Sequence, residues 1–250
     1  MPKSLIEQKP DFSKKVNGEG KLGIAEMFSD TIQGEGVNTG VPATFIRVQG
    51  CVLKCQWCDT IDVWPHGNEY SFEEIFDLFD SVQLPERLKE GQHLVFTGGS
   101  PLRQQKRLYA FTQEFINRYG FKPYIEIENE GVLQADEKFV ELVDCWNNSP
   151  KLENSGMKKK VRFKPEIIKQ LNGFENSWFK FVISNESDWE EIERDFLPII
   201  DKEKIILMPE GVTQEDLNSR REFVADMAIK YGVRFSDRLH VTIWNKQTGV

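Results

Sequence analysis

Three closely spaced cysteines are the residues of this chain best suited to chemistry. Cys51, Cys55 and Cys58 form a C-x₃-C-x₂-C pattern. Three thiolates so close together can ligate three irons of a [4Fe–4S] cube, whereas a cube held by protein alone needs four cysteines. The spacing therefore predicts a cluster with one iron open, and an open iron can bind a small molecule and pass it an electron.

Zinc is the alternative that the cysteines leave open. A structural zinc ion takes four Cys or His ligands, commonly as two short-spaced pairs. The other candidates, Cys145, His66, His93 and His240, are single and unpaired. Cys145 lies in an apolar segment, where a buried and inert thiol is the favoured interpretation. Four cysteines in 250 residues also favour a reducing compartment over a disulfide scaffold.

Strand-like and helix-like segments alternate along the chain. Ser71, with Glu74 three positions later, predicts a capping box at the start of one helix. Gly120 fits the position after the end of a second helix, and Ser187 is expected to cap a third. The predicted strands are residues 43–48, 94–97, 124–128, 178–184, 205–208 and 239–243. After the helix that begins at Ser71, the predicted helices are 103–119, which Gly120 ends, 136–143, 188–200, which Ser187 caps, and 214–231.

Repeated strand–helix units predict an α/β fold with a parallel sheet flanked by helices. About six such units predict an incomplete, partial parallel β/α barrel, which does not close. Ligands of parallel α/β sheets collect at the carboxyl ends of the strands. The cysteine loop directly follows the predicted strand 43–48, so we expect the chemistry at that edge.

Composition limits the class of protein. Hydrophobic residues make up 39% of the chain and aromatic residues 12%, which favours a packed globule. A net charge of −8 argues against nucleic acid as a partner. No apolar stretch has membrane-spanning length, and the N-terminus lacks the apolar core of a signal peptide. We expect a cytoplasmic protein with a flexible extension at residues 1–22 and a single domain at 23–250.

The cysteine loop, with Trp57 before the last cysteine, resembles that of the radical S-adenosylmethionine (SAM) superfamily. A narrower resemblance surrounds the loop, at residues 24–28, 32–36, 40–43, 45–51 and 57–60. Together these motifs resemble the 7-carboxy-7-deazaguanine synthase (QueE) family of the queuosine pathway. The resemblance implies a radical SAM type of partial barrel, a [4Fe–4S] cluster on the three cysteines, and SAM on the open iron.

The resemblance also implies a set of SAM-binding residues on turns that follow predicted strands. They are Trp57, Asp59, Gly99, Glu128, Ser149, Pro150 and Lys151. Alternation along the strand 124–128 places Glu126 and Glu128 on one face. The chain departs from the family pattern at Ser100, Asn129, Glu130 and Met208, and the match around Lys180 is weaker.

A second set of residues is expected at the substrate. Ile32, Gln33, Gly34 and Glu35 would contact the edge of a pterin ring, and Arg47 would clamp its carboxylate. The alternative for Arg47 is a salt-bridged strand arginine. By resemblance, Thr97 and the terminal carboxylate of Val250 contact the substrate, and Thr60 is a magnesium ligand. Magnesium keeps waters and takes substrate oxygens, so one protein hydroxyl suffices.

The resemblance implies a lyase reaction. The reduced cluster would cleave SAM, and the resulting radical would take hydrogen from C6 of 6-carboxy-5,6,7,8-tetrahydropterin. The ring then contracts, ammonia leaves, and 7-carboxy-7-deazaguanine forms. Relatives return SAM intact, use a flavodoxin-type reductant and are homodimers.

Two other functions stay open at this point. One is a different radical SAM enzyme, such as a glycyl-radical activase. The other is an iron–sulfur electron carrier without catalytic activity. The residues at 33–36 and Asp59–Thr60 argue against the activase, and a carrier would not cleave SAM.

Overall fold

One mixed sheet of ten strands organises the part of the chain that this computed structural model describes, residues 3–6, 19–247 and 249. The strands are β1 (Lys3–Ile6), β2 (Lys21–Ile32), β3 (Pro42–Val48), β4 (Asn68–Ser71), β5 (His93–Gly98), β6 (Tyr124–Asn129), β7 (Cys145–Asn148), β8 (Ser177–Ile183), β9 (Ile205–Pro209) and β10 (Arg234–Phe235). Their order in the sheet is β1-β2-β3-β5-β6-β7-β8-β9-β10, with β4 paired to β2.

The sheet is parallel from β3 to β10 and antiparallel at its N-terminal side. Each neighbouring pair from β3–β5 through β9–β10 runs parallel, whereas β2 is antiparallel to β1, β3 and β4. Within the described residues β10 and β1 do not pair, so the barrel stays open. This arrangement confirms the predicted partial parallel β/α barrel.

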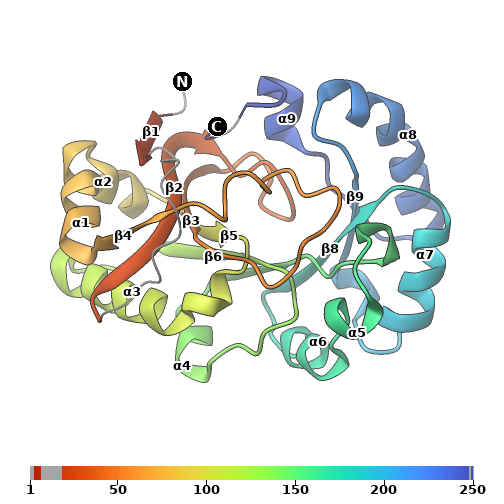
Figure 1. Cartoon of the computed structure of the whole chain (residues 1–250), viewed down its shortest axis with the longest axis horizontal. Coiled ribbons are helices and arrows are strands. Elements are labelled where there is room, and N and C mark those ends of the chain that lie inside the picture. The colour runs from red at the N-terminus through yellow and green to blue at the C-terminus, as the bar shows by residue number, and fades with distance from the viewer. Residues whose placement is uncertain (1–2, 7–18, 248, 250) are drawn as a thin grey trace.

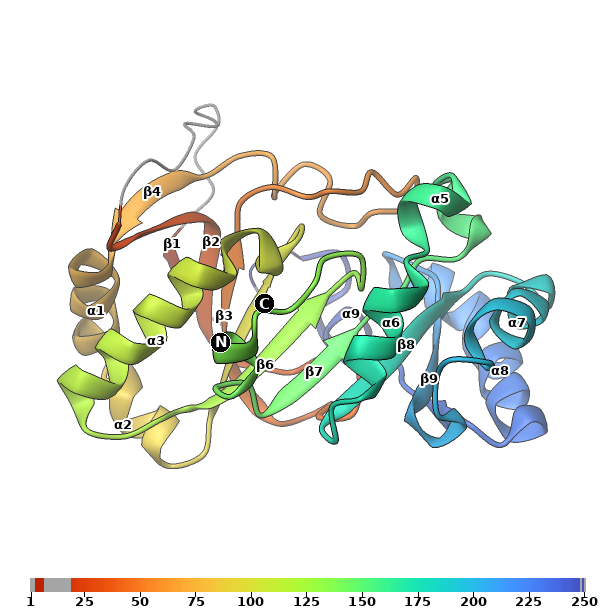
Figure 2. The same cartoon turned by 90° about the horizontal axis from the view of Figure 1, so that it is seen from below.

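Helices surround the sheet (Figure 1). They are α1 (Phe72–Ser81), α2 (Leu84–Lys89), α3 (Gln105–Tyr119), α4 (Glu137–Val140), α5 (Lys159–Arg162), α6 (Pro165–Asn172), α7 (Ser187–Glu191), α8 (Gln214–Tyr231) and α9 (Leu239–Trp244). Helix α9 differs from the others because its residues line the cavity at the carboxyl ends of the strands. Shorter helical turns lie at Pro101–Gln104, Glu153–Ser155, Ile192–Phe196 and Lys202–Lys204. Helix α3 contacts β2, α6 contacts β8 and α8 contacts β9, and Figure 2 shows α3 and α8 at opposite ends of the sheet. No helix in the described ranges is long and apolar enough to span a bilayer.

Local signals in the sequence set the ends of the helices beside the site. The Ser71 Oγ accepts a hydrogen bond from Glu74 N at 3.2 Å, and the Glu74 carboxylate accepts from Ser71 N at 2.7 Å. This capping box begins α1, as predicted. Helix α3 ends where Gly120 adopts φ 75°, a left-handed conformation that costs glycine little, and this end was also predicted.

Aromatic side chains fasten α1 and α3 to the sheet. Phe76 and Phe111 stack with ring centroids 5.1 Å apart, and Phe79, Phe96 and Phe115 pack around them. All five side chains are buried. Burial of one such side chain stabilises a fold by about 1.5–3 kcal/mol. This packing holds β3 and β5, which precede the cysteine loop and the Gly98-Gly99 turn, in fixed positions.

The predicted strand at residues 239–243 was wrong, because this segment forms helix α9. A short run of β-branched residues favours a strand, but its propensity yields to tertiary contacts. Here Leu239 N donates to Gly34 O at 2.8 Å, and Gln214 Nε2 donates to Thr242 O at 2.8 Å. These contacts fix the segment against β2's loop and against α8.

Other differences concern element boundaries. Strands β1, β2, β4, β7 and β10 were not predicted, and β2 begins at Lys21, so the predicted domain boundary at residue 22 falls inside it.

The segment 188–200, predicted as one helix, divides into α7 and a π-helical turn. Ser187 does not cap α7, because the Asp188 carboxylate accepts from Ser184 N and Asn185 N at 2.7 and 3.0 Å and orders the preceding turn instead.

Candidate active site

A cavity of about 390 Å³ opens at the carboxyl ends of the parallel strands. The loops after β3, β5, β6, β7 and β9 all contribute to its wall, and the Ile32–Glu35 segment and α9 close its other side. In Figure 1 the loop between β3 and β4 crosses the centre of the molecule over these strand ends. The position agrees with the general placement of ligands in parallel α/β sheets.

Cys51, Cys55 and Cys58 all line this cavity and are partly exposed. Burial raises the pKa of the Cys51 and Cys55 thiols, because their thiolates are poorly solvated there. Coordination to iron would supply the missing positive charge. Cys145 is buried in β7 and does not line the cavity, as its apolar neighbours predicted.

The geometry of the cysteines fits a cluster better than a single ion. Among the described residues, no group of three or more His, Cys, Asp or Glu side chains is arranged to hold one metal ion. A zinc site needs such convergence, since four ligands lie at about 2.0–2.3 Å from one point. In a [4Fe–4S] cube each cysteine binds a different iron, so its ligands stay apart. The described residues therefore show no convergent four-ligand site of the zinc type.

The cysteine loop is held by backbone contacts on both sides. Gly50 N donates to Trp64 O at 2.9 Å, and Ser100 N donates to Gly50 O at 2.9 Å. A Cβ on Gly99 would lie 2.4 Å from the Cβ of Cys51, so only glycine permits this approach. The loop thus meets the turn after β5 directly, and any side chain on Gly99 would displace the first cysteine.

Most residues predicted at SAM reach the cavity wall. Gly99, Glu128, Ser149, Lys151, Trp57 and Asp59 line it, whereas Pro150 is buried behind it. Lys151 Nζ donates to Ser149 Oγ at 2.8 Å and lies 5.4 Å from the centre of the Trp57 ring. The Glu128 carboxylate accepts from Thr97 Oγ1 at 2.9 Å, and burial raises its pKa.

Glu126 and Glu128 have different surroundings although they share a face of β6. Glu128 lines the cavity, whereas Glu126 is fully buried and does not. The Glu126 carboxylate accepts from Gln33 Nε2 at 2.5 Å and from Asn38 Nδ2 at 2.8 Å. It also accepts from Asn147 Nδ2. Glu126 therefore holds the loop after β2 in place. Of these two strand residues, only Glu128 faces the cavity.

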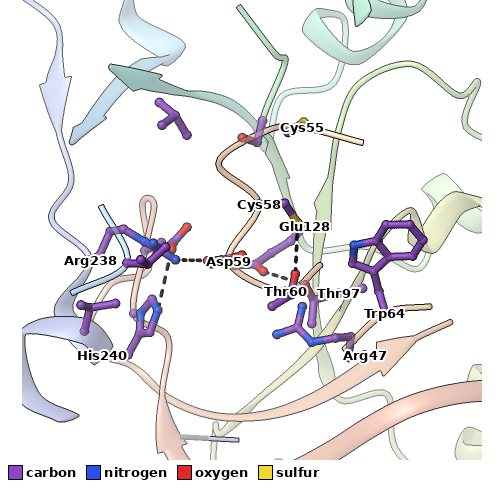
Figure 3. Close-up of a pocket in the computed structure, with 18 of the residues that line it drawn as sticks. Arg47, Cys55, Cys58, Asp59, Thr60, Trp64, Thr97, Glu128, Arg238 and His240 are labelled. Carbon is purple, nitrogen blue, oxygen red and sulfur yellow. Dashed lines mark hydrogen bonds and ion pairs between the residues drawn. The ribbon is translucent and has the colours of Figure 1, made fainter. Parts of the chain in front are cut away.

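The residues predicted at the substrate lie together on the opposite wall. Ile32, Gln33, Gly34, Glu35, Arg47 and Thr97 all line the cavity. Arg47 Nε donates to Glu26 Oε1 at 2.7 Å, and this carboxylate keeps the pKa of Arg47 raised. Arg47 is therefore a salt-bridged strand residue, and its guanidinium points toward Thr60 and Thr97 (Figure 3). Its contact with a substrate carboxylate stays a prediction. Val250 lies outside the described residues.

Sequence reasoning missed the charged network around Glu35. Its carboxylate accepts from Arg238 Nε at 2.8 Å and pairs with Lys180. Arg238 also donates to Asp59 and to Gly211 O. These cations hold the pKa of Glu35 well below its usual value despite burial. Lys180 carried a signal, as a polar residue in an apolar strand, but Arg238 lies in a segment without a motif.

His240 was also missed as a site residue. It lines the cavity from α9, and burial lowers its pKa to about 4. A Cβ on Gly34 would lie 2.0 Å from His240 Nδ1, so glycine at position 34 makes room for the imidazole. The wrong strand assignment at 239–243 hid this contact.

Comparisons with known proteins agree with this site. A family model described as a 4Fe-4S single cluster domain matches residues 32–164. A 7-carboxy-7-deazaguanine synthase of Pyrobaculum aerophilum is 33% identical over 232 residues, which cover 92% of this chain and 97% of the relative. One of Leptospira interrogans is 31% identical, with 92% and 98% covered. The chain belongs to the 7-carboxy-7-deazaguanine synthase family.

The solved structures support the fold of this synthase family member. QueE from Escherichia coli superimposes with a TM-score of 0.63 over 88% of this chain and 95% of that chain, at 24% identity. Family membership confirms the predicted radical SAM lyase class with its [4Fe–4S] cluster and SAM. The three half-buried cysteines on one cavity are the residues of this synthase that fit the cluster.

Proposed function

We propose that this chain converts 6-carboxy-5,6,7,8-tetrahydropterin into 7-carboxy-7-deazaguanine, with loss of ammonia, in 7-deazapurine (queuosine) biosynthesis. One observation carries the proposal. The three cysteines and the salt-bridged Arg47 open on the same cavity, so a cofactor on the cluster and an anionic substrate would meet there. The relatives that span nearly the whole chain bear the name of this activity.

The cluster side of the cavity is assigned to SAM. Held by the three cysteines, the cluster with SAM would supply one-electron radical chemistry. Trp57, Asp59, Gly99, Glu128, Ser149 and Lys151 form the wall for this cofactor. Pro150 shapes the turn between Ser149 and Lys151 from its buried position. The protein contributes placement of the reacting groups and exclusion of water.

The opposite side of the cavity is assigned to the pterin. Arg47 binds Glu26 through Nε, which orients its two Nη groups for a bidentate contact with the substrate carboxylate. The Ile32–Glu35 segment presents backbone groups to the ring edge, because the Gln33 and Glu35 side chains are held by internal partners. Thr97 lies between the two sides and already donates to Glu128.

Thr60 is assigned to magnesium. Its Oγ1 lies 3.7 Å from Cys58 Sγ, next to the cluster loop and in the cavity wall. Mg²⁺ dehydrates reluctantly and binds through few protein ligands together with waters and substrate oxygens. One hydroxyl at the place where Arg47 holds the substrate carboxylate fits that requirement. Chelation of divalent ions should lower turnover and leave SAM binding unchanged.

The partners and the compartment follow from the same proposal. We expect a flavodoxin-type reductant, a homodimer and a cytoplasmic location. Sedimentation of the purified protein tests the dimer. Turnover with a flavodoxin and its reductase, compared with dithionite, tests the reductant.

A product assay tests the proposed function. The protein, loaded with its cluster under anaerobic conditions, is incubated with reductant, SAM and the tetrahydropterin, and the products are identified by mass spectrometry. We expect 7-carboxy-7-deazaguanine. Release of 5′-deoxyadenosine without this product would favour another radical SAM enzyme, and no SAM cleavage at all would favour an electron carrier.

A further inference from the structure

Glu130 is a buried carboxylate without a hydrogen-bond partner. It follows β6 directly, is 4% exposed and lines the active-site cavity. Neither of its carboxylate oxygens has a hydrogen-bond partner among the described residues. Burial raises the pKa of this carboxyl to about 6. Burying an unpaired carboxylate is costly, so a native structure that keeps one calls for an explanation.

Other buried carboxylates of the chain are satisfied. Glu191 accepts from Arg162 Nη1 at 2.5 Å and from Glu153 N at 2.7 Å. Glu126 accepts from three side-chain amides. Within the described ranges, Glu130 alone among carboxylates leaves both oxygens buried and unpartnered. The fold itself therefore gives no role to this charge.

The polar groups near Glu130 are engaged with other partners. Ser100 Oγ accepts a hydrogen bond from Val52 N at 3.0 Å and donates one to Cys51 Sγ at 3.6 Å. Lys151 Nζ donates to Ser149 Oγ. The Ser100 hydroxyl and the charges of Lys151 and Arg103 lower the pKa of this carboxyl. None of them forms a hydrogen bond with its oxygens. The site therefore tolerates an anion without completing its hydrogen bonds.

The position of Glu130 indicates which end of a ligand it would meet. Its negative charge is close enough to Cys51 to raise the pKa of that thiol. Glu130 and Cys51 also line the same cavity, so the two residues lie near each other on its wall. SAM placed with its methionyl end at the open iron would bring its amino group to this region. An amine bound to iron keeps N–H donors, and a carboxylate is the strongest acceptor for them.

We propose that Glu130 is a SAM-binding residue whose carboxylate accepts a hydrogen bond from the amino group of the cofactor's methionyl end. The inference rests on the proposed function, since it requires SAM on the open iron. It assigns the missing partner of a buried anion to the only amine that the cofactor carries on its amino-acid portion. The cofactor's carboxylate carries no donor, and the adenosine portion lies at the other end of the molecule from the iron-bound amine.

The test measures binding to the cluster-loaded enzyme rather than turnover. The affinities of the wild type and of Glu130→Gln are compared for SAM, decarboxylated SAM and 5′-methylthioadenosine under anaerobic conditions. Decarboxylated SAM keeps the amine, and methylthioadenosine lacks the whole amino-acid portion. We expect Glu130→Gln to weaken the first two ligands by about ten-fold or more and the third by less than about two-fold.

Glu126→Gln is the matched control, because Glu126 lies on the strand that Glu130 directly follows, is buried and does not line the cavity. It should lower thermal stability while keeping the wild-type ratio of SAM to methylthioadenosine affinity. Glu130→Gln should instead raise the melting temperature of the SAM-free protein, since it removes a buried unpaired charge. Glu130→Asp keeps the charge and should recover part of the wild-type ratio of SAM to methylthioadenosine affinity. It replaces Glu130→Gln in the test if that variant does not load the cluster.

Two outcomes overturn the inference and are distinct from failure of the proposed function. One is an equal loss of affinity for all three ligands in Glu130→Gln, which would reflect a change of cavity shape. The other is wild-type affinity for SAM in that variant. A wild type that does not bind SAM at all would contradict the proposed function itself.

Discussion

Arg238 donates a hydrogen bond to Asp59, a residue 179 positions earlier in the chain. The contact joins the segment before α9 to the residue that follows the third cluster cysteine. Figure 3 shows Arg238 directed at Asp59. The same guanidinium donates to Glu35 at 2.8 Å, so one side chain connects the cysteine loop with the loop after β2. The loop assigned to the cofactor and the loop assigned to the substrate are therefore positioned by one guanidinium.

Replacing Arg238 by Met should destabilise the protein. The change leaves Glu35 with Lys180 as its cationic partner and leaves Asp59, whose side chain is 40% exposed, to solvent. Because part of the charge stays compensated, we expect a loss of about 2 kcal/mol of unfolding free energy, below the range for a fully unpaired buried ion. The melting temperature of the cluster-free protein should fall by about 4–8 °C.

Lys230→Met is the control for this substitution. Lys230 forms an ion pair with Glu186 in which both side chains are more than half exposed. An exposed pair contributes less than about 1 kcal/mol. Equal melting temperatures for the two variants would show that the Arg238 network does not hold the loops.

The cysteines provide the second prediction. Ala at Cys51, Cys55 or Cys58 should abolish the visible absorbance of the cluster and the cleavage of SAM, because three ligands already leave one iron open. Cys145→Ala should keep both, since Cys145 is buried in β7 away from the cavity wall. A cluster-loaded, active Cys55→Ala protein would refute the ligand assignment.

Arg47 separates substrate binding from cofactor binding. Arg47→Ala should weaken pterin binding by about 10- to 100-fold, the loss expected for a charged hydrogen bond. SAM binding and uncoupled SAM cleavage should persist. The double variant with Glu26→Gln removes the carboxylate that Arg47→Ala leaves unpaired, and it should show the same pterin defect with better stability. An equal loss of affinity for the pterin and for SAM would contradict the assignment of Arg47 to the substrate.

His240 predicts how stability depends on pH. Its pKa is about 4 in the folded protein and about 6.5 in an unfolded chain, so the unfolded state binds the proton more tightly. Stability is then fully present above pH 6.5 and is lost as pH falls toward 4, by at most about 3 kcal/mol. Chemical denaturation of the wild type and His240→Gln across this range measures it. Identical pH profiles would exclude His240 as the cause.

The sequence was sufficient for the parts of the site that short-range patterns encode. The cysteine spacing, the Gly98-Gly99 turn and the capping box at Ser71 each depend on residues within a few positions of one another. The alternation of strand and helix segments along the chain followed from periodicity, which is why the partial barrel was predictable although several strands were not. The resemblance indicated Glu128 and Arg47, and both lie on parallel strands whose carboxyl ends meet at one edge of the sheet.

Long-range contacts set the limit of sequence reasoning. Glu35 meets Arg238 across 203 positions, and no local pattern marks either residue as part of an ion pair. Glu126 is structural and Glu128 faces the cavity, because Gln33 and Asn38 donate to Glu126 alone in the folded chain. The segment 239–243 forms a helix in spite of its strand propensity, because it contacts Gly34 and α8. The wrong strand assignment also kept His240 from being recognised as a site residue.

The central claim is that SAM and the pterin react within one cavity, and transfer of a hydrogen atom tests it most directly. The cluster-loaded enzyme is supplied with reductant, SAM and 6-carboxy-5,6,7,8-tetrahydropterin deuterated at C6, and both the remaining SAM and the product are examined by mass spectrometry. We expect 7-carboxy-7-deazaguanine together with deuterium at the 5′ carbon of SAM. Product formation with no deuterium in SAM or in 5′-deoxyadenosine would contradict the claim.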